Sequence, residues 1–130
     1  MDETGDLMVF VTEPIATPEE LKKWVLIAFA FAIPLYILLA LIGQANPGFP
    51  AAIAVYMVVL NAGMFWRSRG HVWFWITIAA LSLAHFLLII SIHWPRISMI
   101  GRALLPMGGL DFLMIFGSMK LAQRLFVEST

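Results

Sequence analysis

Uncharged hydrophobic residues fill four stretches of this chain, and polar residues gather in the short segments between them. The first stretch, WVLIAFAFAIPLYILLALIG, is long enough to cross about 30 Å of hydrocarbon as a helix that rises about 1.5 Å per residue. The pattern predicts an all-α membrane protein with four transmembrane helices in an up-down-up-down bundle. The four predicted spans are approximately residues 21–43, 50–66, 71–94 and 100–124.

A helix start signal precedes the first span. Thr17 is suited to cap the helix, Pro18 to occupy its first position, and Glu20 to complete a capping box. Residues 1–17 are therefore predicted to form an acidic N-terminal arm, and residues 18–127 one transmembrane domain. The segment GQANPGFP contains two prolines and two glycines, so we expect a loop between the first two spans.

The amino-acid composition also indicates a membrane protein. Of the 130 residues, 62% are hydrophobic and 12% are charged, whereas a soluble domain carries about 25% charged residues. The formal net charge is zero, so no basic surface predicts a nucleic-acid partner. The chain has no cysteine, which excludes disulfides and thiolate metal sites. The expected surroundings are therefore a lipid bilayer.

Lysine and arginine predict the orientation of the spans. With both termini inside, the inner side would hold six of these residues and the outer side two: Lys22, Lys23, Arg67, Arg69, Lys120 and Arg124 against Arg96 and Arg102. The positive-inside rule then places both termini in the cytoplasm, and we expect a bacterial inner membrane protein. The tryptophans also lie near span ends, where an aromatic belt belongs: Trp24, Trp66, Trp73, Trp75 and Trp94.

One carboxylate lies deep within the predicted membrane domain. Asp111 is the only acidic residue between Glu20 and Glu128. A carboxylate at the centre of the bilayer costs roughly 2.5–3.5 kcal/mol of insertion free energy, and such residues commonly mark functional sites. Gly108 and Ser118 share its helical face, and small residues of this kind suit a close helix contact. The sequence therefore predicts that Asp111 faces another helix.

His85 is predicted to be the partner of Asp111. It lies 14 residues after His71, or about 21 Å along the third helix, and Asp111 lies 13 residues before Arg124, or about 20 Å from the same side. The third and fourth helices are expected to be antiparallel neighbours, so the two side chains should approach within hydrogen-bond reach. The pair is either a hydrogen bond that fixes helix register or a protonatable couple that binds a proton, an ion or a polar group.

Other polar residues extend this candidate site. Tyr36 and Tyr56 lie near the same depth, and each hydroxyl is expected to find a hydrogen-bond partner. Ser82 lies one turn before His85. Asn61 is expected either to bind another helix or to reach interfacial water, and His93 to be an interfacial histidine near the outer surface.

No cofactor or metal is predicted. His71 and His85 are 14 residues apart on one helix, a spacing that could serve stacked haems, but no other span contains a histidine to supply facing ligands. Only a symmetric dimer could provide them. His85 and His93 also lack the spacing and the further ligands of a metal site.

Three functions fit these residues. The favoured one is an accessory or binding subunit, an assembly partner in a membrane complex or homo-oligomer. The first alternative is a small proton-coupled transporter or permeation protein that acts as a dimer, because four helices alone pack around a filled centre. The second alternative is a membrane-embedded enzyme acting on a lipid or isoprenoid, with His85 and Asp111 as acid and base.

Overall fold

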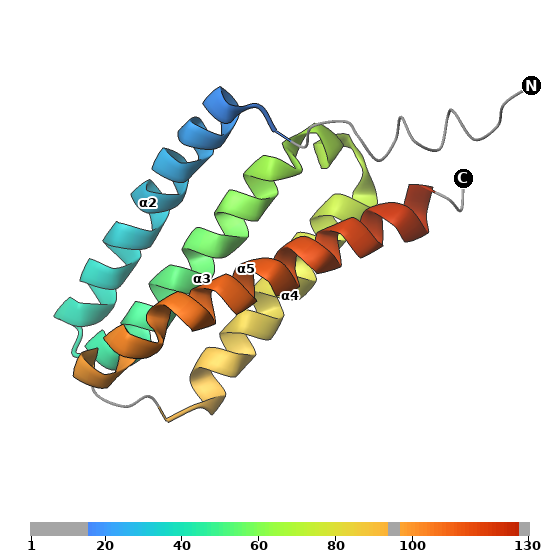
Figure 1. Cartoon of the computed structure of the whole chain (residues 1–130). Coiled ribbons are helices and arrows are strands. Elements are labelled where there is room, and N and C mark those ends of the chain that lie inside the picture. Colours follow the sequence, from blue (N-terminus) through green and yellow to red (C-terminus); the bar gives the residue numbers. More distant parts are fainter. Residues whose placement is uncertain (1–15, 94–96, 128–130) are drawn as a thin grey trace, which may run out of the picture.

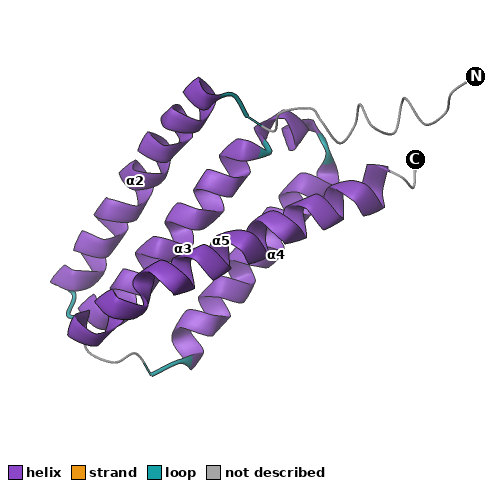
Figure 2. Ribbon diagram, in the orientation of Figure 1, coloured by secondary structure: helices purple, strands orange, loops and turns teal. Residues whose placement is uncertain are grey.

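Helices account for the regular structure of the described residues, as Figures 1 and 2 show. The computed structural model describes residues 16–93 and 97–127, with side chains described for residues 16–93 and 106–126. The elements are α2 (Pro18–Leu41), α3 (Ala45–Met64), the short 3-10 helix η1 (Trp66–Gly70), α4 (Val72–Ser91) and α5 (Ile97–Val127). Most of the predicted N-terminal arm lies outside the described residues, as do Trp94 and Arg96.

Three of the described helices are long and apolar enough to cross a membrane. They are α2, α3 and α4, which have 24, 20 and 20 residues. Large apolar side chains on their outer faces are exposed, among them Phe31, Leu41, Val72 and Phe86. Such a surface is stable in hydrocarbon and not in water, because lipid chains are as apolar as leucine. The chain is therefore a membrane protein.

The predicted start of the first helix is confirmed. The Thr17 amide donates to Glu20 Oε2 at 2.8 Å, and the Glu20 amide donates to Thr17 Oγ1 at 3.2 Å. These two bonds form the capping box, with Pro18 at the first helical position. The Arg67 guanidinium of η1 also lies 3.7 Å from Glu20 Oε2. The first turn of α2 is thereby tied to η1.

The second helix begins earlier than predicted. It starts at Ala45, although the two prolines of GQANPGFP had indicated a loop up to residue 49. Pro47 lies in the first turn, where a backbone N–H has no acceptor within the helix, so the proline costs no hydrogen bond there. The turn between α2 and α3 is consequently short, and Gly43 reverses the chain with a φ of 80°.

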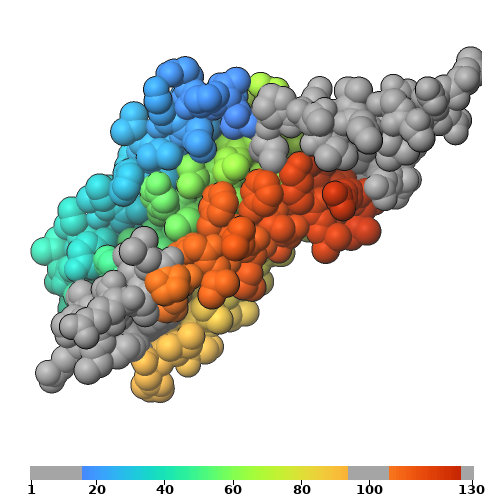
Figure 3. Space-filling model, viewed as in Figure 1, coloured from blue at the N-terminus to red at the C-terminus, as the bar shows by residue number. Residues whose placement is uncertain are grey.

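The helix α3 is the centre of the described fold. It packs along α2 on one side and against α4 and α5 on the other, whereas α2 contacts neither α4 nor α5 in the described part of the chain. Figure 3 shows α3 exposed between α2 and α5. The core lies at the end of the molecule near η1 and consists of Phe65, Trp73, Phe74, Ile115 and Met119.

Small residues allow α2 and α3 to lie close together. Ala28 and Ala32 of α2 are buried, as are Gly48 and Ala52 of α3, and each of these pairs is separated by one helical turn. A Cβ atom at Gly48 would lie 2.9 Å from the Leu39 Cβ. The backbones of α2 and α3 can therefore come close together, because the side chains between them are very small.

Candidate functional site

The predicted contact between α4 and α5 is confirmed. His85 Nε2 lies 2.6 Å from Asp111 Oδ1, and His85 Nδ1 lies 2.7 Å from the Leu81 carbonyl oxygen one turn earlier. The side chains of His85 and Asp111 are 17% and 24% exposed, respectively. The pair therefore lies on the flank of the helices, where surrounding lipid or a partner can reach it.

The two contacts of His85 limit where its protons can be. A carbonyl oxygen only accepts hydrogen bonds, so the Leu81 contact requires a proton on Nδ1. The contact between His85 Nε2 and Asp111 Oδ1 then holds one proton. With the proton on Nε2, the pair is an imidazolium and a carboxylate; with the proton on Oδ1, it is a neutral imidazole and a carboxylic acid. In both forms the pair is electrically neutral as a whole. Gaining or losing one further proton would place a net charge within the helices.

The other predicted residues do not join this pair. Ser82 is exposed on α4, and no hydrogen bond links it to His85 or Asp111 among the described residues. Tyr36 and Tyr56 line a separate pocket, on the other side of α5 from the contact with α4. Their hydroxyls form no hydrogen bond with any described residue, so the expected hydrogen-bond partners are not found there.

Asn61 is fully buried in α3. Its amide nitrogen donates to the Met57 carbonyl at 2.9 Å, while its side-chain oxygen has no partner in the described structure. The indole N–H of Trp73 in the same core is likewise buried without a partner there. His93 is exposed just beyond the end of α4, and His71 is exposed at its beginning.

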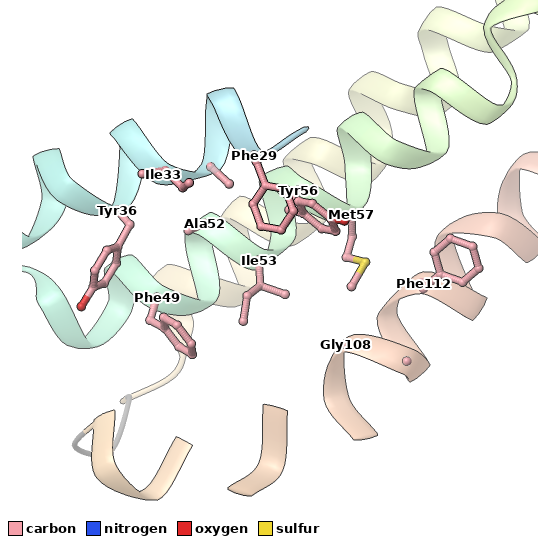
Figure 4. A pocket seen from close by; sticks show the side chains of 12 residues that line it. Phe29, Ile33, Tyr36, Phe49, Ala52, Ile53, Tyr56, Met57, Gly108 and Phe112 are labelled. Atoms are coloured by element: carbon pink, nitrogen blue, oxygen red, sulfur yellow. The ribbon is translucent and has the colours of Figure 1, made fainter. Parts of the chain in front are cut away.

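A pocket of about 640 Å³ lies between α2 and α5, with α3 as its floor. Figure 4 shows Phe29, Ile33 and Tyr36 of α2 on one side and Gly108 and Phe112 of α5 on the other. This pocket was not predicted from the sequence. The adjacent Gly108 and Gly109 were a signal for it, because two glycines leave a helix without side chains at that point.

Asp111 and the pocket occupy different flanks of α5. Consecutive residues of a helix are rotated by about 100°, so Asp111 points to α4 while Phe112 lines the pocket. No protein-family model, curated protein or solved structure matches this chain.

Proposed function

We propose that this protein is an accessory subunit of a membrane protein complex. It associates through the flank of α4 and α5 with a second copy of itself or with another membrane protein. The observation that carries the proposal is the 2.6 Å contact between His85 and Asp111. A structural hydrogen bond does not require two ionisable groups, and their partial exposure leaves the pair accessible from the bilayer. The proposed role of the pair is to make association depend on a proton.

We further propose that α5 crosses the bilayer as a fourth span and that successive spans alternate in direction. The motivation is the excess of lysine and arginine on the side that would hold both termini. Because the chain has no cysteine, single cysteines can be introduced without background labelling. Cysteines at Ser68 and Asn46 should react with an impermeant reagent from the cytoplasmic and outer sides, respectively. The opposite labelling pattern would overturn the orientation.

The test of the proton-dependent role replaces Asp111 by asparagine. Asp111→Asn keeps a hydrogen-bonding side chain but cannot ionise, so we expect it to insert and fold while losing the pH dependence of association. Association would be measured by energy transfer between donor-labelled and acceptor-labelled copies in liposomes, between about pH 5 and 8 where histidine titrates. Wild-type protein should show a pH-dependent change of severalfold.

Ser82→Ala provides the matched control, because Ser82 is an exposed polar residue one turn from His85 that takes no part in the contact. It should behave as wild type, and His85→Gln should behave as Asp111→Asn. An Asp111→Asn protein with the wild-type pH profile would leave only a structural role for the pair. Wild-type copies that do not associate at any pH, yet co-purify with another membrane protein in an Asp111-dependent way, would identify that protein as the partner.

The two alternatives have less support. A transporter that acts as a dimer would need a solute path at the same flank, but the large pocket lies on the other side of α5. An enzyme would need several polar groups around one substrate, but the two tyrosines line a pocket apart from His85 and Asp111. Binding through a protonatable pair requires neither feature.

A further inference from the structure

The pocket between α2 and α5 has the dimensions of a small-molecule site. Its volume of about 640 Å³ lies within the range of about 300–1,000 Å³ that is usual for ligand and cofactor pockets. It exists because α2 packs on α3 and contacts η1 but leaves α5 at a distance. The open side faces the surroundings of the helices, so a ligand dissolved in the bilayer can enter from there.

Five of the twelve residues that line this pocket are aromatic. Phe29 and Tyr56 lie with ring centroids 4.8 Å apart, and Tyr36 and Phe49 with centroids 5.9 Å apart; Phe112 of α5 adds a fifth ring. Faces and edges of aromatic rings favour another flat, polarisable group over a saturated chain. The lining therefore suits a planar ligand better than the acyl chains of ordinary phospholipids.

The phenol groups of Tyr36 and Tyr56 are the polar groups beside the pocket, and the Tyr36 hydroxyl points away from α5 (Figure 4). The hydroxyls of Tyr36 and Tyr56 make no hydrogen bond within the described residues, and both rings contribute to the lining. An unpaired hydroxyl in hydrocarbon is costly, so a ligand that brings an acceptor is favoured over one that does not. Acyl chains carry no acceptor beyond their ester groups, which lie at the membrane surface. A ring carbonyl supplies the missing acceptor within the bilayer.

We propose that this pocket binds a lipid-soluble quinone. The flat ring packs among the aromatic side chains, a quinone carbonyl accepts a hydrogen bond from the Tyr56 hydroxyl, and the hydrocarbon tail leaves through the open side. This inference is independent of the proposed role of His85 and Asp111, because those residues do not line the pocket.

One glycine of α5 allows the pocket to be filled without disturbing the fold, and a second glycine provides a control. Gly109 lines the pocket, and a Cβ atom placed there would meet nothing within 4 Å. Gly117 is also free of neighbours within 4 Å but lies outside the lining. Gly109→Leu should therefore occupy the ligand space, and Gly117→Leu is a matched control for the same change on the same helix.

The experiment measures binding of decyl-benzoquinone to the full-length protein in phosphatidylcholine nanodiscs by titration calorimetry. We expect saturable binding that is equal in wild type and Gly117→Leu, at least about tenfold weaker in Gly109→Leu, and about fivefold weaker in Tyr56→Phe. Decylbenzene, which has the ring and tail without carbonyls, should bind about as weakly to wild type as the quinone does to Tyr56→Phe.

Three results would overturn the proposal: no saturable quinone binding, equal binding by Gly109→Leu and wild type, or decylbenzene binding as tightly as the quinone. The last result would identify a site for hydrocarbon alone. The Asp111→Asn protein should bind the quinone as wild type does. Failure of the quinone experiment and failure of the pH-dependent association are therefore separate outcomes.

Discussion

Between α2 and α3 the backbones come so close that glycine and alanine fill the contact, whereas between α4 and α5 two ionisable side chains meet. The first contact extends along most of both helices, from Trp24 beside Gly63 at one end to Leu39 beside Gly48 at the other. The second contact contains one strong polar interaction, that of His85 with Asp111. The same chain thus joins its helices in two different ways.

The difference follows from the bilayer as a solvent. Lipid chains are as apolar as the helices, so no hydrophobic effect drives α2 onto α3, and close van der Waals contact over small residues has to provide the stability. Polar pairs between membrane helices contribute on average only about 0.6 kcal/mol. The α2–α3 contact is therefore expected to stabilise the fold, and the α4–α5 pair to serve another purpose.

The largest expected effect comes from filling the α2–α3 contact. A Cβ atom at Gly63 would overlap the side chain of Trp24, so Gly63→Leu must push α2 away from α3. We expect it to reduce the free energy of unfolding by about 4 kcal/mol or more, as a severe overpacking does. Unfolding in mixed micelles with increasing dodecyl sulfate, followed by circular dichroism, would measure the change.

Two further variants make this result specific. Gly117→Leu adds the same side chain to α5 in open space and should leave the unfolding curve unchanged. Gly63→Leu combined with Trp24→Ala should recover part of the loss, because the overlapping ring is removed. If Gly63→Leu unfolded at the same dodecyl sulfate concentration as Gly117→Leu, the contact between α2 and α3 would not be tight.

Sequence periodicity and length were sufficient to place the helices but not their ends. The predicted spans 21–43 and 71–94 differ from α2 and α4 by one to three residues at each end. The start of α3 was missed because proline was read as a loop signal, although the first turn of a helix accepts it. The sequence also contains a signal for the close approach of α2 to α3, because glycine and alanine recur one turn apart in these helices.

The candidate sites differ in how far the sequence could predict them. Helical rise places His85 and Asp111 at one depth on neighbouring helices, and only one carboxylate and one histidine compete for that depth. The pocket combines residues from three helices, and it depends on α2 and α5 not touching. That gap is a property of tertiary packing, so the glycine pair in α5 could indicate a place without side chains but not the distance between α2 and α5.

A smaller effect is expected when the α4–α5 pair is made apolar. His85→Leu alone leaves the Asp111 carboxyl without its partner, and loss of one member of a buried pair costs about 3 kcal/mol. Replacing both residues by leucine removes that penalty, and apolar replacements of buried ion pairs are commonly neutral or stabilising. The double variant should therefore unfold at or above the dodecyl sulfate concentration that unfolds wild type, and His85→Leu should unfold below it.

Such a result would show that the fold does not need the pair. A double variant less stable than His85→Leu would instead show that the polar contact holds α4 to α5, and the contrast with the α2–α3 contact would no longer stand.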